Sequence, residues 1–415
     1  MRNILSQISW KKYYTTIAAI ILMAISLVAY RYMPQMMPSY VYGSYIIREI
    51  YTYVILYTIL FGHAIVRGQK INNFALSFTI VYLIQLASQL ISNIAFGRNW
   101  GIEQLAASFL IGMTTAALLD KKFIPKTCMR SEVYIEMGII CLATKIFCST
   151  GDLMTDVRCF AQVIASVSVC VILSTLVGRI VCRDRKLRKL ATHTVYSTSV
   201  IFTTVIAKVL KTNNRRLLIV ALLYSIISTV EMVAIRELLQ LFTIPTDISN
   251  AWLAPCTSSH AGWCKLPESL GSVARSQIAL SVKSAQYAIC LIVAAAIPTI
   301  KYLSQIRQKN GDKTQPADTA AASDANSPKI PPLLVGFVIV WLMFMLVPQE
   351  NVHDTNTVTQ GFAYTMFNFA FASLGFCTKP DSILRHSDVG LFVMLLISQI
   401  IFVSVSLGMA AIIFG

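Results

Sequence analysis

Two short polar stretches interrupt an otherwise apolar chain, and they carry the residue types best suited to hold a solute. Residues 191–210 are rich in hydroxyls, and residues 249–268 mix prolines, a glycine and charges with apolar side chains. Hydroxyls and the free backbone N–H groups of an interrupted helix donate hydrogen bonds without a full charge, which suits an anion that must also leave. The candidate substrate-binding residues are Thr194, Ser197, Thr198, Ser199, Ser258, Ser259, His260 and Lys283.

Each of these side chains also has a plainer interpretation. A serine or threonine hydroxyl can bond back to a carbonyl of its own helix, and His260 can be a structural histidine. Lys283 can offset the charge of an anion, pair with Glu231, or extend toward the membrane surface. Glu231 and Lys208 are therefore candidates for ion coupling or for a structural ion pair.

The chain has ten cysteines, and most of them fall inside apolar runs, where cysteine behaves as a small buried hydrophobe. Cys256 and Cys264 are expected to share a polar loop on the outer side of the membrane, where an oxidising compartment could join them. Two free thiols that simply pack are the alternative.

Sequence motifs of the common enzymes and pumps are missing. There is no nucleotide-binding glycine-rich loop ending in Gly-Lys-Ser/Thr, no His-Glu-x-x-His, no Gly-x-Ser-x-Gly and no cysteine or histidine spacing typical of zinc. We therefore expect no cofactor, no metal and no catalytic residues.

The composition is that of a membrane protein. Hydrophobic residues make up 56% of the 415 residues and charged residues 13%, against roughly 45–50% and 25% in soluble domains. Apolar runs of about 20 residues can cross a bilayer as helices. The sequence predicts an all-α polytopic protein with eleven such spans: 13–30, 45–66, 72–95, 101–119, 131–149, 157–182, 217–242, 275–300, 331–348, 359–377 and 389–413.

The net charge of +16 lies in short loops between these runs, so it indicates topology and not a nucleic-acid partner. The loops 120–130, 183–190 and 301–313 are basic, whereas 149–156, 243–256 and 349–358 contain no lysine or arginine. Basic loops stay in the cytoplasm. The amino terminus is thus expected inside and the carboxyl terminus outside, in the lipid bilayer.

The two polar stretches are predicted to be broken or re-entrant elements. Either both cross the membrane or neither does, because all later loops obey the charge rule in both cases. We favour one element entering from each side, which is typical of an inverted-repeat transporter. Residues 303–330 are poor in large apolar side chains and predict a flexible cytoplasmic linker, although an incidental loop is the alternative. This divides the chain into 1–70, an additional two-helix region; 71–302, the first part of the core; the linker 303–330; and 331–415, the last three helices.

Several stretches, in this order, resemble the YeiH-like sulfate exporter family of bacterial inner-membrane proteins. They are 101–119, 132–148 with Gly138, 206–226 with Lys208, 258–284 with His260 and Lys283, and 370–378 with Gly375. The chain departs from the family in its core motif, which falls on 193–199 and lacks the cysteine and the glycine, and at Ala261, where the family has glutamate.

The resemblance implies an inverted-repeat core in a bacterial inner membrane and transport of sulfate or a similar anion. The leading hypothesis is a secondary transporter that exports a small anion by alternating access. A non-transporting scaffold or sensor, or a membrane-embedded enzyme that reuses the fold, is the alternative. The oligomeric state stays open, and a homo-oligomer is compatible with the sequence.

Overall fold

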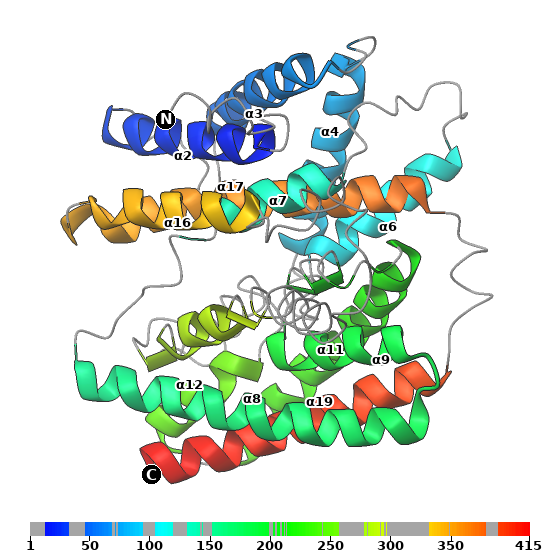
Figure 1. Cartoon of the computed structure of the whole chain (residues 1–415), viewed down its shortest axis with the longest axis vertical. Helices are drawn as coiled ribbons and strands as arrows, with labels where there is room; N and C mark the ends of the chain where they lie inside the picture. The colour runs from blue at the N-terminus through cyan, green and yellow to red at the C-terminus, as the bar shows by residue number, and fades with distance from the viewer. Residues whose placement is uncertain are drawn as a thin grey trace, which may run out of the picture.

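The structure is a computed structural model, and its described part is helical, with no strand among the described residues (Figure 1). It describes residues 13–32, 46–68, 71, 74–93, 104–118, 131–141, 143, 152–198, 202–203, 206–207, 210, 212, 214–242, 244–256, 278–279, 281–290, 292–293, 296, 332–347, 349–378 and 389–415. A described helix covers most of every predicted span except 275–300, which is described only in pieces.

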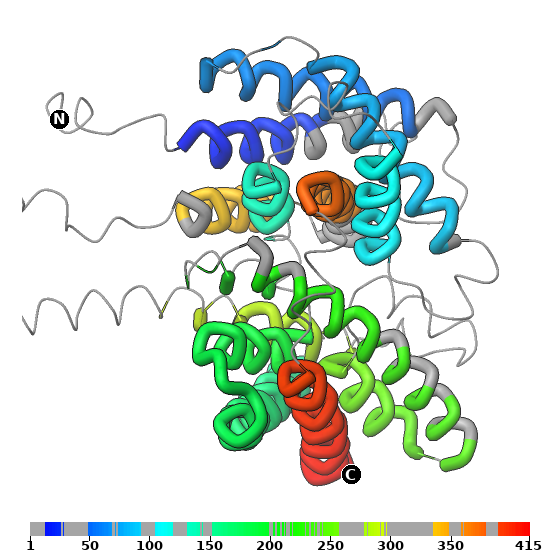
Figure 2. The backbone as a smooth tube through the Cα atoms, turned by 90° about the vertical axis from the view of Figure 1, so that its right-hand side faces the viewer, coloured from blue at the N-terminus to red at the C-terminus, as the bar shows by residue number. Residues whose placement is uncertain are grey.

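The described helices form two bundles, which both views show one above the other (Figures 1 and 2). In the first bundle, α17 packs against α6, α7, α4 and α2, and α16 packs against α2 and α7. Its members are α2 (Tyr14–Tyr32), α3 (Ile46–Val66), α4 (Phe74–Asn93), α6 (Gln104–Leu118), α7 (Ser131–Cys141), α16 (Pro332–Met345) and α17 (Gln349–Cys377).

The second bundle is organised around α19, which packs against α8, α12, α9 and α11. Its helices are α8 (Leu153–Val181), α9 (Arg185–Ser197), α11 (Asn214–Leu241), α12 (Thr246–Cys256) and α19 (Val389–Phe414). The helical segment 281–290 also belongs to it, because its side chains bond to α8, α9 and α12. The described parts of both polar stretches therefore lie in one bundle.

Among the described residues, four helices are long and apolar enough to cross a membrane: Glu49–Val66, Phe74–Ser92, Leu153–Val181 and Val389–Phe414. At about 1.5 Å per residue, the 26 residues of α19 span about 39 Å, more than a hydrocarbon core of about 30 Å. The outward faces of these helices are apolar, for example at Ile180, which is 86% exposed. Such faces suit lipid and not water, as expected of a multi-pass helical membrane protein.

Three segments predicted to be loops or breaks are helical instead. α17 begins at Gln349, inside the predicted outer loop 349–358, and α9 begins at Arg185, inside the predicted basic loop 183–190. α12 begins at Thr246, inside the predicted loop 243–256. Charged and polar residues at a helix end look like a loop in sequence, although they are well tolerated there because the terminal backbone groups face water or a cap.

Two glycines explain how closely α6 and α17 approach. A Cβ built on Gly375 would lie 2.2 Å from the carbonyl oxygen of Phe109, and one built on Gly112 would lie 2.5 Å from that of Ala372. No side chain fits at either position without moving the helices apart. A Cβ built on Gly138 of α7 would lie 2.8 Å from the ring of Phe367 on α17. These contacts fix α17 as the central helix of the first bundle.

Candidate functional site

The first polar stretch is interrupted at Thr198. Helix α9 ends at Ser197, and Thr198 adopts the left-handed conformation with φ 43°, which is unfavourable for a β-branched residue. The Thr198 hydroxyl lies 2.8 Å from the carbonyl oxygen of Pro255, to which it donates a hydrogen bond. A contact to a second chain segment thus accompanies the strained backbone.

Pro255 lies in the last turn of α12, which ends one residue later at Cys256. The ends of α9 and α12 therefore meet at Thr198 and Pro255. The two helices enter from opposite ends of the second bundle (Figure 1). α9 follows the end of α8 after residues 182–184, whereas α12 begins beside the carboxyl terminus, where a Cβ on Gly415 would lie 3.5 Å from Ile248. We call this meeting point the crossing.

Helix lengths agree with a crossing near the middle of a membrane. The 13 residues of α9 span about 20 Å and the 11 residues of α12 about 16 Å, against a hydrocarbon core of about 30 Å. The described residues of neither helix are enough to reach across alone.

Gln286, from the helical segment 281–290, joins both helix ends. Its side-chain amide donates to the carbonyl of Tyr196 at 2.8 Å, to the Thr198 hydroxyl at 3.1 Å and to the carbonyl of Pro255 at 3.1 Å. Gln286 is completely buried. Sequence reasoning missed it, because a single glutamine in an apolar run has no pattern. The only available signal is its position three residues after Lys283, on the same helix face.

Lys283 is the buried cation of the crossing. It is 1% exposed, and its ammonium donates to the Thr198 hydroxyl at 3.0 Å. The ammonium also lies 5.4 Å from the centre of the Tyr287 ring, within the range of a cation–π contact. The sequence predicted that Lys283 and the hydroxyls of the first stretch share a site, and the structure brings Lys283 and Thr198 together.

The backbone groups at the crossing differ from the prediction. We expected free N–H groups, but the described ends of α9 and α12 are carboxyl-terminal ends, which present carbonyl oxygens and a partial negative charge. The Lys283 ammonium and the Gln286 amide face this partial charge. The Lys283 ammonium is thus the described feature that could attract an anion.

Two other hydroxyls of the first stretch, those of Thr194 and Ser197, bond back to α9 as the plainer interpretation expected. Thr194 donates to the carbonyl of Leu190 at 2.8 Å, and Ser197 donates to the carbonyl of Thr194 at 3.1 Å. Thr203, beyond the break, donates to the Thr194 hydroxyl at 2.9 Å. This last bond ties α9 to the chain that continues after the interruption.

Glu231, on α11, has Gln399 of α19 as its hydrogen-bond partner, and not Lys283. The Gln399 amide donates to one Glu231 oxygen at 2.8 Å. Glu231 and Lys283 are nonetheless close enough to interact electrostatically. Gln399 is a second polar residue that sequence reasoning missed, again because it stands alone in an apolar run.

The remaining predicted residues are less informative. Cys256 was expected in an outer loop, but it is a free, fully buried thiol at the end of α12, because α12 extends to it and packs against α19. The following predicted residues lie outside the described part of the chain: Ser199, Lys208, Ser258, Ser259, His260 and Cys264.

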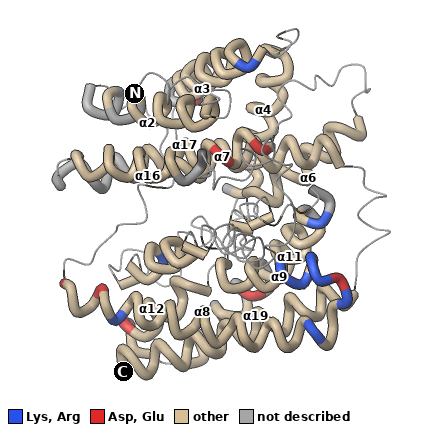
Figure 3. Tube along the Cα trace, viewed as in Figure 1, with Lys and Arg blue, Asp and Glu red and all other residues tan. Residues whose placement is uncertain are grey.

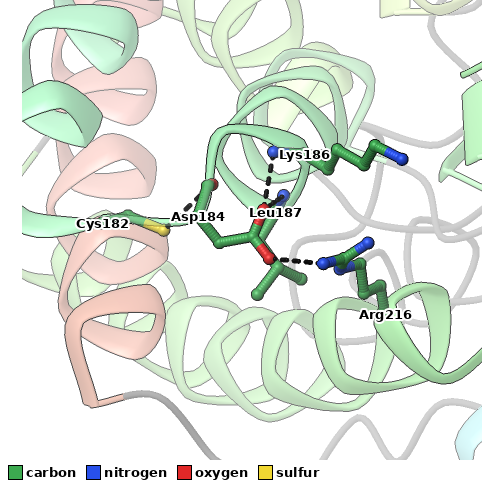
Figure 4. Close-up of polar contacts among 5 residues, drawn as sticks. All are labelled: Cys182, Asp184, Lys186, Leu187 and Arg216. Carbon is green, nitrogen blue, oxygen red and sulfur yellow. Dashed lines mark hydrogen bonds and ion pairs between the residues drawn. The ribbon is translucent and has the colours of Figure 1, made fainter. Parts of the chain in front are cut away.

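A capped, charged corner holds α9 at its outer end (Figure 4). The Asp184 carboxylate accepts hydrogen bonds from the backbone N–H groups of Lys186 at 2.8 Å and Leu187 at 3.3 Å. It also forms an ion pair with Arg216 of α11 at 2.9 Å. Burial opposes ionisation of Asp184, but these donors hold the pKa of its carboxyl group below the usual range. Lysine and arginine gather at this end of the bundle (Figure 3), as the predicted cytoplasmic side requires.

Comparison with known proteins gives no further identification. No protein family model, no curated protein and no solved structure matches this chain. The function must therefore be argued from the crossing itself.

Proposed function

We propose that the protein is a secondary transporter that moves a small anion, sulfate-like or organic, by alternating access. The single observation that carries this proposal is the crossing, where Thr198, Pro255, Lys283 and Gln286 bring two interrupted segments together in the interior of the second bundle. Interrupted helices that meet at mid-depth are how many secondary transporters build a substrate site. A buried lysine is otherwise strongly disfavoured in a membrane protein.

In this mechanism Lys283 supplies the positive charge for the anion, and Thr198 supplies a hydroxyl that can turn from Pro255 to the substrate. The second bundle carries the site, and the first bundle is the body against which it moves. The grouping of contacts supports this division, because the extensive helix contacts fall within one bundle or the other. Helices whose exposed side chains are mostly apolar, such as α8, can face lipid during such a movement.

The finer topology is part of the proposal. It has eleven spans, two re-entrant elements at 191–210 and 249–268, an inverted-repeat core, a cytoplasmic amino terminus and a bacterial inner membrane as its location. In support, α8 and α19 lie side by side and run in opposite directions (Figure 1). The beginning of α8 and the carboxyl terminus therefore share one end of the bundle, as expected if both face outside.

A non-transporting scaffold or sensor is the second candidate, and one observation favours it. The Lys283 ammonium faces two helix ends that carry partial negative charge, so it could serve only to hold the crossing together. In that case the crossing is static, and no anion reaches Lys283.

Flux measurements separate these candidates. The purified protein is reconstituted into liposomes, and uptake of radiolabelled sulfate, sulfonates and organic anions is followed with and without an imposed ion gradient. Transport predicts saturable uptake of at least one of these anions above that of protein-free liposomes. Uptake equal to that of protein-free liposomes for every anion, with correctly folded protein, would favour the scaffold.

A further inference from the structure

Buried oxygen atoms without a hydrogen-bond partner gather in the second bundle. Within the described part of the chain they include five side-chain acceptors: the free oxygens of Gln162, Glu231, Asn250, Gln286 and Gln399. The four amide residues are at most 3% exposed. Buried polar groups are normally satisfied, so a group of unsatisfied acceptors indicates something that is bound there.

Three of these acceptors belong to side chains on α12 or bonded to it. The amide nitrogen of Gln162 donates to the carbonyl of Ala251 at 2.8 Å, and that of Gln286 donates to the carbonyl of Pro255 at 3.1 Å. Ala251 and Pro255 are four residues apart, about 6 Å along a helix. Asn250, next to Ala251, is on the same turn. In each glutamine the nitrogen is used, and the oxygen is left over.

α19 brings the carboxylate into the same region. The Trp252 indole donates to the carbonyl of Val403 at 3.0 Å, and Gln399 lies one helical turn before Val403. Gln399 in turn donates to Glu231 at 2.8 Å, which leaves one oxygen of each side chain without a partner. Glu231 is also within electrostatic range of Lys283 and Cys256.

The chemistry of these groups selects a cation. All five atoms are hard oxygen acceptors, which repel an anion and attract a hard cation. A proton would satisfy one oxygen, whereas a metal ion can be bound by several at once. A single carboxylate with a lysine nearby suits one positive charge better than two. We propose that the free oxygens of Glu231 and Gln399, two side chains joined by a hydrogen bond of 2.8 Å, bind Na⁺.

This site gives the proposed transport a coupling mechanism, and that second step rests on the proposed function. The charges of Glu231 and Lys283 offset one another when both are ionised. An anion bound at Lys283 alone, or Na⁺ bound at Glu231 alone, leaves an uncompensated charge in a medium of low dielectric constant. Binding of both removes this penalty, so each should increase the affinity for the other.

Binding of Na⁺ is tested on the purified protein without any anion substrate other than chloride. Equilibrium binding of ²²Na⁺ is measured at constant chloride, with choline replacing Na⁺. The thermal unfolding midpoint is compared in the same two salts. We expect saturable binding and a rise in the midpoint of about 2 °C in NaCl, because a ligand that binds only the folded state stabilises it.

Three variants locate the site. Glu231→Gln removes the charge with little change in shape and should weaken binding at least tenfold. Gln399→Leu keeps the carboxylate and should weaken binding by a smaller factor, and it serves as the test if Glu231→Gln does not fold. Gln85→Leu is the matched control, because Gln85 is a buried glutamine of α4 in the first bundle whose oxygen also has no partner. It should leave binding unchanged.

Several outcomes would overturn the inference. The wild-type protein could fail to bind Na⁺, or Gln399→Leu and any folded Glu231→Gln could bind it with unchanged affinity. A midpoint that does not depend on Na⁺, and whose dependence on pH is reduced in Glu231→Gln, would show that Glu231 takes up a proton instead. Because no transported anion is present in this assay, a failure to bind Na⁺ leaves the proposal of anion transport intact. Conversely, Na⁺ binding without anion flux would contradict the proposal of anion transport and leave the Na⁺ site intact.

Discussion

Replacement of Gln286 by leucine tests whether the crossing is held together as described. The Gln286 amide lies within hydrogen-bond distance of three acceptors, on Tyr196, Thr198 and Pro255. An amide nitrogen has only two hydrogens, so these contacts amount to at most two full hydrogen bonds, each contributing about 1 kcal/mol net. Leucine has a similar volume and should leave little cavity.

Two further effects partly cancel. The Tyr196 carbonyl loses this donor, and an unsatisfied buried acceptor costs about 1–3 kcal/mol. Leucine also removes the Gln286 oxygen, which has no partner at present, and so recovers part of that cost. Pro255 keeps the Thr198 hydroxyl as its donor. We therefore expect the free energy of unfolding to fall by about 2 kcal/mol.

The assay is denaturant unfolding in detergent micelles, followed by tryptophan fluorescence. Gln85→Leu is again the control, because it loses one hydrogen bond, at 3.1 Å to Gln89, and should cost less than about 1 kcal/mol. If Gln286→Leu is as stable as the wild-type protein, or no less stable than Gln85→Leu, Gln286 does not hold the two helix ends together.

Three further predictions address packing, the charged corner and topology. Gly375→Ala should destabilise the folded protein by about 1–3 kcal/mol, because the new Cβ would lie 2.2 Å from the Phe109 carbonyl oxygen. The control is Gly408→Ala, whose Cβ meets nothing within 4 Å and which should stabilise the protein by a few tenths to 1 kcal/mol. Equal shifts of the thermal unfolding midpoint in the two variants would contradict the close packing. Because the pKa of Asp184 is lowered in the folded protein, its ionised carboxylate contributes stability that is present above about pH 4 and is lost as the pH falls through the pKa of the folded state. Asp184→Asn should therefore make the free energy of unfolding depend less on pH in the acid range. An unchanged dependence on pH would contradict this. Single cysteines at Asn214, where α11 begins, and at Asp247, in the first turn of α12, should react with an impermeant thiol reagent from the inside and the outside respectively. Labelling of both from outside would mean that 191–210 crosses the membrane.

The apolar runs were enough to predict where most helices lie, because a bilayer demands about 20 apolar residues for each crossing. Helix ends were predicted less well. The basic residues after Asp184 looked like a loop, yet Asp184 caps a helix there, and the acidic residues after Gln349 are part of α17. Charge patterns distinguish the membrane surface from its interior, but they do not distinguish a loop from a polar helix end.

Part of the candidate site could also be predicted from single residues. Thr198 and Lys283 stand out as a hydroxyl in a polar stretch and a charge in an apolar one, and they lie 3.0 Å apart. Gln286 and Gln399 do not stand out, because their importance comes from carbonyl and carboxylate groups that distant segments bring to them. Cys256 was misplaced for the same reason, since only the packing of α12 against α19 shows that it is buried.

The most direct test of the central claim is anion flux through Lys283→Met in proteoliposomes. The matched control is Lys186→Met, which removes an equal charge from an exposed position at the start of α9. Both variants must first show a wild-type elution profile in gel filtration. If Lys283 binds the anion, Lys283→Met should lower uptake at least tenfold, whereas Lys186→Met should transport at close to the wild-type rate. Uptake by folded Lys283→Met at the wild-type rate would show that the crossing is not the anion site.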